Sequence, residues 1–461
     1  MVMYPEKFIE RINDQEYIDA TSMLKALGEP SPVSIRINPF KWNNIPYNYD
    51  PVPWCSGGFY LKERPSFTMD PLFHAGCYYP QEASGMFLEQ VFRQVSDGQK
   101  DLRVLDLCGA PGGKSTHLSA LIGNDGFLVA NEVIRTRASV LAENITKWGV
   151  SNAIVTQSDP SAFSRLPGFF DIMLIDAPCS GEGMFRDQVA LDEWSVDNTL
   201  LCCERQKRIL SDSWPALKED GILIYSTCTF NPDENEKNMK WLISKGEAES
   251  LKLDVSGYEG ITEIDYQGIY GYGFYPGRIR GEGLFISVIR KQGKNRTTSY
   301  GKLKNTVRSP GRDEIKTAHD LTGFNADQLI VHNDEIVSIP CSINDYSILS
   351  SSLKIVKPGT AIFRLKKNVI PSHELALSVF LRKSVFLTLN LEYADAIKYL
   401  RRDTVNAAGE TRGWQIASYE GVNLGFVNNL VNRLNNYYPV EWRIRMSVQS
   451  GAEQKTVKWK S

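Results

Sequence analysis

Residues 101–290 alternate short apolar runs with helix-forming stretches, and this rhythm constrains the fold more than any other feature of the chain. The pattern predicts strands at residues 104–108, 126–132, 153–158, 171–176, 221–227 and 284–289. It predicts helices at residues 114–122, 135–148, 199–218 and 233–244. Strands that alternate with helices in this way form a parallel sheet with helices on both faces. We therefore expect an α/β fold with a doubly wound sheet.

Two cysteine-containing segments directly follow strands of this predicted sheet. Residues 176–181 read DAPCSG and include Cys179, while residues 226–230 read STCTF and include Cys228. In open α/β sheets, functional groups gather beyond the carboxyl ends of the parallel strands. The two thiols are therefore predicted to meet over one pocket.

A third strand of the predicted sheet runs into a glycine-rich turn. The turn consists of Cys108, Gly109, Ala110, Pro111, Gly112, Gly113 and Lys114. Glycines let the backbone pass close to a ligand and direct amide groups toward it. Because the turn matches neither GxGxxG nor the P-loop spacing GxxxxGK[ST], it is not specific for one ligand on its own.

Carboxylates stand at the predicted ends of the next two strands. Glu132 lies where a carboxylate can bind both hydroxyls of a ribose, and Asp159 lies where a side chain could contact an adenine amino group. These positions predict a nucleotide-like cofactor. A nicotinamide dinucleotide would fit them too, and the two cysteines decide against it.

Two thiols beside a carboxylate suit one reaction in particular. C5 of cytosine is a poor nucleophile toward a sulfonium methyl group, but a thiolate that adds at C6 makes C5 enamine-like. The reaction also needs a hydrogen-bonding group at N3 and a second group for elimination, and Asp176, Cys179 and Cys228 supply this set. A cation such as Lys114 would favour the thiolate if it lies nearby. The alternative is that both cysteines are merely small buried residues.

Four stretches in this order resemble the family of RNA cytosine-C5 methyltransferases known as NOL1/NOP2/Sun. They are VLDLCGAPGGKSTHL (104–118), ANE (130–132), LIDAPCSGEGMFR (174–186) and STCTFNPDENE (226–236). GEGMFR, together with the later PSHELAL (371–377), RGWQIA (412–417) and LGFVNN (424–429), resembles the bacterial subgroup that acts on small-subunit ribosomal RNA. The resemblance implies a Rossmann-like class I methyltransferase domain, S-adenosylmethionine as cofactor and ribosomal RNA as partner.

The resemblance also implies roles for individual residues. Cys228 corresponds to the family's nucleophile, and Cys179 to the cysteine that assists release of the methylated product. The cofactor would be bound by residues 108–114 and by Glu132, Asp159 and Asp176. Lys114 and Asp176 would also lie near the target base.

Composition limits the class of protein. The chain has 461 residues, 42% of them hydrophobic and 23% charged, which is typical of a soluble protein with two or three domains. No apolar run approaches the length of a membrane span. Its eight cysteines are scattered without a zinc-ligand spacing. This predicts free thiols, no metal site and a reducing, cytoplasmic setting, with Cys108, Cys202 and Cys203 packed among apolar residues.

The regions around the central domain are expected to contact RNA. We expect an N-terminal α+β region at 1–95, the methyltransferase domain at 96–292, a basic linker at 293–320 and a smaller C-terminal α+β domain at 321–461. Residues 291–320 hold eight Lys or Arg against three acidic residues. A basic linker can bind phosphates or be an ordinary solvated loop. A second candidate surface consists of Arg433, Arg443, Arg445, Tyr437, Tyr438 and Trp442.

Two other functions fit parts of the sequence. A non-catalytic ribosome-assembly factor on a retained methyltransferase fold would need neither cysteine nor the glycine turn. An amino-methyltransferase would carry an (N/D)PP(Y/F) segment in place of residues 176–179, which read DAPC. The sequence therefore favours a monomeric enzyme that methylates cytosine C5 in ribosomal RNA.

Overall fold

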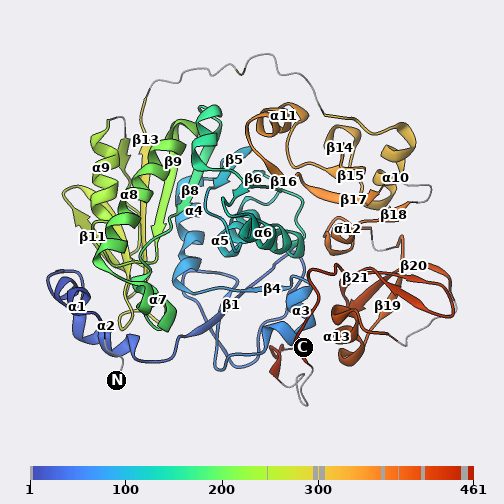
Figure 1. The fold of residues 1–461 in the computed structure, drawn as a ribbon, viewed down its shortest axis with the longest axis horizontal. Helices are drawn as coiled ribbons and strands as arrows, with labels where there is room; N and C mark the ends of the chain where they lie inside the picture. Colours follow the sequence, from blue (N-terminus) through green and yellow to red (C-terminus); the bar gives the residue numbers. More distant parts are fainter. Residues whose placement is uncertain are drawn as a thin grey trace.

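The fold is built on one large central sheet (Figure 1). A computed structural model describes residues 4–246, 248–293, 300, 307–364, 369–382, 384–405, 411–447 and 455–460. The parallel strands of the sheet are β5 (Leu102–Asp106), β6 (Gly126–Asn131), β7 (Ala153–Thr156), β8 (Phe170–Asp176) and β9 (Leu217–Thr227). The doubly wound α/β fold is confirmed, and each expected strand lies within a few residues of its predicted place.

Antiparallel strands extend the sheet at both edges. β13 (Leu284–Lys291) pairs with β9 and is followed by β12 (Ile269–Phe274) and β11 (Thr262–Tyr266), while β10 (Ala248–Ser250) pairs with β13. At the other edge, β16 (Ile355–Lys357) pairs with β7. The C-terminal part of the chain therefore contributes a strand to the central sheet.

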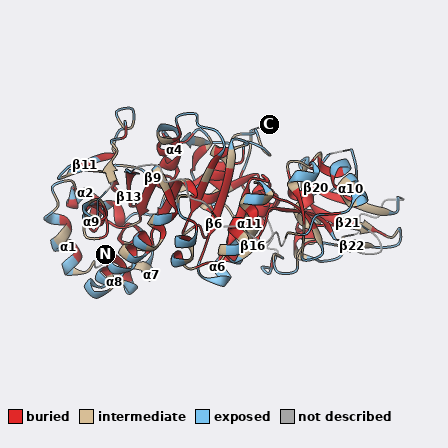
Figure 2. Ribbon diagram, turned by 90° about the horizontal axis from the view of Figure 1, so that it is seen from above, coloured by how far each residue is buried: buried red, intermediate tan, exposed pale blue. Residues whose placement is uncertain are grey.

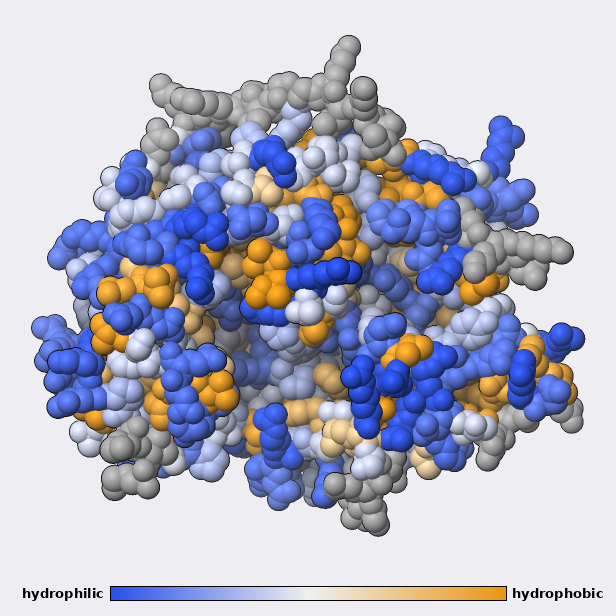
Figure 3. All heavy atoms as spheres, viewed as in Figure 1, coloured by the Kyte–Doolittle hydropathy of each residue, from blue (hydrophilic) through white to orange (hydrophobic). Residues whose placement is uncertain are grey.

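Helices bury both faces of the sheet. One face is covered by α4 (Leu88–Ser96), α5 (Gly113–Ile122) and α6 (Arg135–Trp148), and the other by α8 (Val196–Ser213) and α9 (Glu236–Ser244). The strands are buried throughout the centre, whereas the helices expose their outer sides (Figure 2). On the face shown in Figure 3, apolar side chains form separate patches between hydrophilic ones.

The strand order reverses between β5 and β8. From β5 the chain proceeds outward to β6 and β7, then returns to β8 on the other side of β5. Adjacent loops at such a switch point diverge to opposite faces of the sheet and leave a crevice beyond the carboxyl ends of the strands. Both cysteine segments and the glycine turn lie at this edge.

The N-terminal region contains two helices and a small sheet. Helices α1 (Glu6–Asn13) and α2 (Ala20–Leu27) precede a sheet with the order β2-β3-β1-β4. The bounds of the strands are Val33–Ile37 (β1), Tyr49–Pro51 (β2), Gly58–Leu61 (β3) and Tyr78–Pro80 (β4), with α3 at Pro71–His74. A short helix, α7 (Gln188–Glu193), packs near α1.

Two further sheets follow the central one. The first contains β14 (Leu329–His332), β15 (Glu335–Ser338), β17 (Thr360–Arg364) and β18 (Ile370–Pro371), with α11 (Ile343–Ser352) and α12 (His373–Leu377). The second contains β19 (Leu387–Asn390), β20 (Gly413–Tyr419), β21 (Val422–Asn429) and β22 (Leu434–Asn436), with α13 (Tyr393–Arg401). Residues 321–461, expected as one α+β domain, therefore hold two sheets.

The last sheet packs against the N-terminal sheet. Ile35 and Tyr78 share one buried cluster with Leu400 and Tyr438, and the Tyr393 hydroxyl donates a hydrogen bond to the Met69 carbonyl at 3.0 Å. The regions expected to bind RNA at the two ends of the chain thus form one continuous body beside the central sheet (Figure 1).

The expected basic linker at 293–320 differs from the structure in its last part, where α10 (Arg312–Thr322) begins. The Glu314 carboxylate accepts a hydrogen bond from the Gly311 amide at 2.6 Å, and Gly323 ends the helix with a φ of 84°. The sequence does not predict this helix, because basic residues dominate the stretch and only a narrow face of the helix is apolar. Lys294, Arg296, Lys302 and Lys304 lie outside the described residues. In the part of the chain that the structure describes, no helix is both long and apolar enough to cross a membrane.

Candidate active site

The two predicted cysteines meet at the carboxyl edge of the sheet. Cys179 Sγ lies 3.2 Å from Cys228 Sγ, and the Cys228 amide donates a hydrogen bond to Cys179 Sγ at 3.3 Å. Asp176 at the end of β8 is in register with Ser226 near the end of β9, so the loops that follow emerge side by side. The two thiols thus lie together at one edge of the sheet, as the sequence predicts.

A buried carboxylate holds the two cysteine loops together. Glu234 accepts hydrogen bonds from the Ser180 amide at 3.0 Å and from Gln206 Nε2 at 2.9 Å, and from the Ser180 hydroxyl at 2.5 Å. Gln206 Nε2 also donates to the Pro178 carbonyl at 3.0 Å. Burial raises the pKa of Glu234, while these hydrogen bonds favour its charged form. Sequence reasoning missed this residue, although it lies within the ENE of the last matching stretch.

Lys114 and Asp176 form an ion pair beside the thiols. Lys114 Nζ lies 2.8 Å from Asp176 Oδ2, and the Ser226 hydroxyl donates to Asp176 Oδ1 at 2.7 Å. Burial of Lys114 favours its neutral amine and so lowers its pKa. The charge and the hydrogen bond of Asp176, together with the interaction with Cys228, outweigh burial, so the pKa of Lys114 is raised. Lys114 therefore stays positively charged beside the thiol pair.

The two thiols differ in their surroundings. The hydrogen bond with Cys228, followed by burial, raises the pKa of the Cys179 thiol well above its ordinary value. Cys228 Sγ also lies 3.7 Å from the Met184 thioether. These contacts place both sulfur atoms within reach of one substrate ring, and the division of their roles follows from the family resemblance.

The thiols line a cavity together with the predicted cofactor residues. Its volume is about 720 Å³, within the range of small-molecule sites. Six predicted residues form part of its wall: Cys108, Ala110, Glu132, Asp176, Cys179 and Cys228. A cofactor bound by the glycine turn and a base held over the thiols would therefore share one space.

The glycine turn lies tightly against its neighbours. A Cβ at Gly109 would lie 2.7 Å from Ser115 Oγ, and Gly112 has a φ of 119°, which side chains rarely adopt. The Gly109 amide donates to the Asn131 carbonyl at 2.7 Å, and Asn131 Nδ2 donates to the Leu107 carbonyl at 3.1 Å. The turn is thus fixed to β6 before any ligand is bound. Pro111 and Gly113 complete it, and α5 begins at Gly113.

The two cofactor carboxylates differ in exposure. Glu132 is 4% exposed and lines the cavity, with Oε1 accepting from the Ile134 amide at 3.0 Å and Oε2 3.4 Å from Arg137. Asp159 caps the turn that follows β7, and its carboxylate accepts from the Ser161 amide at 3.0 Å. Its side chain is 44% exposed and is not part of the cavity wall, although the adjacent Pro160 is. Asp159 would have to turn inward to contact a ligand.

Comparison with known proteins identifies the family. The family model of the 16S rRNA methyltransferase RsmB/F matches residues 94–290, which include the parallel strands of the central sheet and both cysteines. The N-terminal domain of the 16S rRNA methyltransferase RsmF matches residues 4–83, and the RsmF PUA domain matches residues 386–444. A ribosomal RNA small subunit methyltransferase F from Enterobacter sp. is 30% identical over 95% of this chain and 96% of its own length. This chain belongs to the RsmB/F family of 16S rRNA methyltransferases.

Further relatives of the RsmB/F family agree with this assignment. The methyltransferase F of Shewanella sp. strain MR-4 is 31% identical over 95% of this chain and 97% of its own length. Among solved structures, a methyltransferase homolog from Pyrococcus horikoshii is 30% identical, with a TM-score of 0.53 over 62% of this chain and 95% of its own. NSun6 from the same organism, solved with SFG, is 21% identical with a TM-score of 0.52 over 63% of this chain and 99% of its own, which supports the fold.

The RsmF-like GEGMFR segment contributes directly to the site. The Gly183 amide donates to the Cys228 carbonyl at 2.9 Å, and Met184 next to it contacts the Cys228 thiol. Arg186 has a side chain only 8% exposed and donates to the carbonyls of Ala26 and Gly281. Arg186 therefore anchors the N-terminal helices to the catalytic edge. From the sequence, GEGMFR was recognised only as a subgroup marker.

The predicted RNA surface in the PUA-domain match is only partly exposed. Arg433 and Arg443 are exposed, as is Tyr437. Tyr438 is 1% exposed, and its ring packs 5.6 Å from that of Tyr399. The prediction that Tyr438 stacks on RNA is wrong, because its ring fills the core between the N-terminal and C-terminal sheets.

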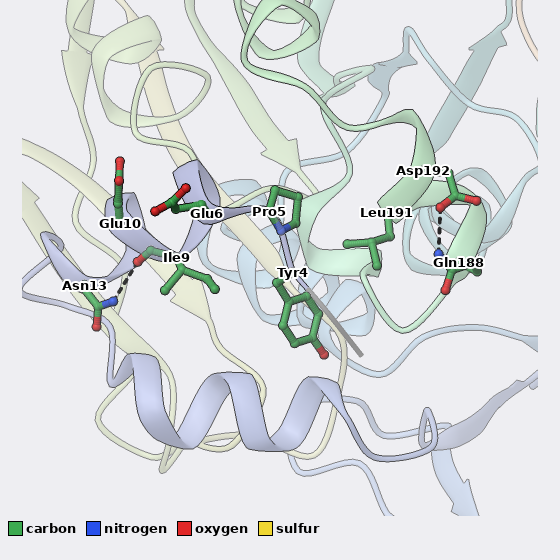
Figure 4. Close-up of a pocket in the computed structure, with 9 residues that line it drawn as sticks. All are labelled: Tyr4, Pro5, Glu6, Ile9, Glu10, Asn13, Gln188, Leu191 and Asp192. Atoms are coloured by element: carbon green, nitrogen blue, oxygen red, sulfur yellow. Dashed lines mark hydrogen bonds between the residues drawn. The ribbon is translucent and has the colours of Figure 1, made fainter. Parts of the chain in front are cut away.

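A second cavity lies away from the cysteines, between α1 and α7. Its volume is about 750 Å³, and Figure 4 shows Tyr4 and Ile9 facing Leu191 across it. Its hydrogen bonds are local, from Asn13 Nδ2 to the Ile9 carbonyl and from Gln188 Nε2 to Asp192. The wall of this cavity carries neither a thiol nor a buried charge, so it is not the candidate active site.

Proposed function

We propose that this chain transfers the methyl group of S-adenosylmethionine to C5 of cytosine in small-subunit ribosomal RNA. The observation that carries the proposal is the pair of thiols 3.2 Å apart on the wall of a cavity that Glu132 also lines. Family membership supports the cofactor and the RNA. The eight free cysteines support a cytoplasmic setting, and we further infer that the chain acts as a monomer.

The chain's own residues would supply the covalent chemistry. S-adenosylmethionine, held by residues 108–113 with Glu132 and Asp159, supplies an electrophilic methyl group. The Cys228 thiolate adds to C6 of cytosine, and the electron pair of the C5–C6 double bond moves to C5. Lys114 stabilises the thiolate by its charge. The base takes up a proton from water at N3 and donates a hydrogen bond from this position to the Asp176 carboxylate.

Release of the product needs a second sulfur. After methylation, the C5 proton leaves to the thiolate of Cys179, the C5–H electron pair restores the double bond, and Cys228 Sγ departs with the electrons of its bond to C6. The contact with Cys228 raises the pKa of Cys179, so Cys179 keeps its proton while Cys228 is the thiolate. Once Cys228 is bonded to C6, Cys179 loses this proton to water, and its thiolate is then a strong acceptor for the C5 proton. With Sγ atoms in contact, addition and elimination require no movement of the loops.

Single cysteine substitutions test this mechanism. Cys228→Ala should abolish methylation and form no covalent RNA adduct. Cys179→Ala should add to RNA and methylate it, then remain linked to it on a denaturing gel. Cys341→Ala, which removes a half-buried thiol outside this site, is the control and should keep activity.

Two results would overturn the assignment. An adduct in Cys228→Ala and none in Cys179→Ala would exchange the two roles. Activity in both variants would end the covalent mechanism. Bisulfite sequencing of ribosomal RNA from cells with and without the gene tests the reaction itself: RNA binding without any lost methylcytosine would favour the assembly-factor alternative.

A further inference from the structure

Three potential metal ligands meet in the interior, away from the cysteine pair. Among the residues that the structure describes, Cys55, Glu89 and His117 form the one group of three such side chains whose ligand atoms all lie within 4.8 Å of one another. His117 Nε2 lies 4.0 Å from Cys55 Sγ and 3.4 Å from Glu89 Oε2. All three side chains are buried, with exposures of 4% or less.

The three ligands come from separate elements. Cys55 lies in the loop between β2 and β3, Glu89 in α4 and His117 in α5. Helices α4 and α5 pack side by side against the central sheet (Figure 1). Because α5 begins at the glycine turn, an ion held here would tie the N-terminal sheet to the helix that positions Lys114.

The ligand set favours zinc over other common cations. Thiolate and imidazole are ligands of zinc, whereas magnesium and calcium take oxygen ligands. Zinc binds sulfur at about 2.3 Å and nitrogen or oxygen at about 2.0–2.2 Å, so neighbouring ligand atoms stand roughly 3–4 Å apart. The two separations from His117 Nε2, 3.4 and 4.0 Å, are of this size. A thiolate and a carboxylate also carry two negative charges, which match a divalent cation.

Contacts around the group leave the ligand atoms available. Glu89 Oε1 is engaged by Arg93 at 2.7 Å and by the Ser56 amide at 3.2 Å, so Oε2 is directed toward His117. Partners of this kind orient ligands in known metal sites. The nearby Arg36 donates its hydrogen bonds to Gln81 and Thr116.

Without an ion, the three side chains contact one another directly, and His117 Nε2 lies 3.4 Å from Glu89 Oε2. An ion bound between them would replace these contacts with ligand bonds to Nε2, to Oε2 and to the Cys55 sulfur, which would lose its proton on binding.

We propose that Cys55, Glu89 and His117 bind a zinc ion. A cavity of about 400 Å³ lies beside the three residues, and its wall includes the exposed Asn43 and Arg93. This cavity gives a route for the ion and room for a water molecule as fourth ligand. The sequence predicted no metal because the three ligands are 34 and 28 residues apart, a spacing that matches no zinc motif.

The test measures metal binding rather than methyl transfer. The full-length chain carries Cys179→Ser and Cys228→Ser, because the catalytic thiol pair could itself bind zinc. After chelation and dialysis it is titrated with Zn²⁺ and, separately, with Co²⁺. We expect one equivalent of zinc by elemental analysis, a thiolate-to-cobalt absorption band in the near ultraviolet and a higher melting temperature with Zn²⁺.

Variants in the same background assign the site. His117→Gln and Glu89→Gln keep nearly the original shape, and each should lower zinc affinity at least tenfold; Cys55→Ser should also abolish the cobalt band. Cys341→Ser, a half-buried thiol elsewhere, is the matched control and should bind as the parent does. Circular dichroism verifies that each variant is folded. A parent that binds no Zn²⁺, or glutamine variants that bind it as tightly as the parent, would overturn the proposal.

Discussion

Removal of the Glu234 carboxylate should separate the two cysteine loops. In Glu234→Ala, the Ser180 amide and Gln206 Nε2 lose acceptors at 3.0 and 2.9 Å in a buried setting. Each buried donor left unpaired costs about 1–3 kcal/mol. We expect the free energy of unfolding to fall by about 2–6 kcal/mol, with turnover reduced at least tenfold because the sulfur atoms lose their fixed spacing.

The effect should be confined to the thiol end of the cavity. Glu132 makes no contact with the Glu234 network, so calorimetry should give an unchanged affinity for S-adenosylmethionine. Glu234→Gln keeps an oxygen for the Ser180 amide and can donate to the Ser180 hydroxyl, so it should retain most of the stability and turnover. Urea unfolding and single-turnover methylation measure the two quantities.

A neighbouring carboxylate provides the control. Glu236 is also buried, but its Oε2 has no hydrogen-bond partner and it does not contact the cysteine loops. Glu236→Ala should therefore leave turnover unchanged. If Glu234→Ala unfolds and turns over like the parent, or if Glu236→Ala loses as much turnover, then Glu234 does not position the thiols.

Three further predictions concern the cofactor, pH and RNA. Glu132→Ala should weaken S-adenosylmethionine binding at least tenfold in calorimetry, since each charge-assisted hydrogen bond contributes roughly 1.5–3 kcal/mol, and unchanged affinity would remove Glu132 from the pocket. Burial raises the pKa of Asp106 to about 7, so the folded chain holds a proton that the unfolded chain releases between about pH 4 and about pH 7, and stability should fall as pH rises across that window. Asp106→Asn should remove this slope from urea unfolding curves, and an equal slope in both proteins would contradict the shift. Exchange of Lys302, Lys304 and Arg308 for Glu should weaken RNA binding and flatten its salt dependence, whereas an unaltered salt slope would leave this stretch as an ordinary linker.

The position of the active site was predictable because it depends on local patterns. Apolar runs mark the strands, and the carboxyl-end rule then places Asp176, Cys179 and Cys228 at one edge. The same rule places Glu132 on the cavity wall. It is less informative for Asp159, because a residue three positions beyond the end of β7 belongs to a turn whose direction depends on local hydrogen bonds.

Contacts between distant elements were not predictable from such patterns. Glu234 follows Cys228 by six residues, yet its partners Ser180 and Gln206 come from another loop and from α8. The sequence places Tyr438 on the surface because it does not reveal that the C-terminal sheet, β19 to β22, packs on the N-terminal sheet, β1 to β4. Cys55, Glu89 and His117 likewise carry no motif, since only the packing of α4 on α5 brings them together.

Helix α5 connects these separate features in one rigid element. The helix begins at Gly113, in the glycine turn, and its second residue, Lys114, pairs with the Asp176 carboxylate. His117 lies one turn later and contacts Glu89 of α4. A shift of this helix would therefore move the glycine turn and the partner of the Asp176 carboxylate at the same time. Arg36 strengthens the connection, since it donates to the Gly113 carbonyl and to Thr116 from the N-terminal sheet. A contact made on the N-terminal sheet would thus reach the Lys114–Asp176 ion pair through hydrogen bonds that already exist in the free protein.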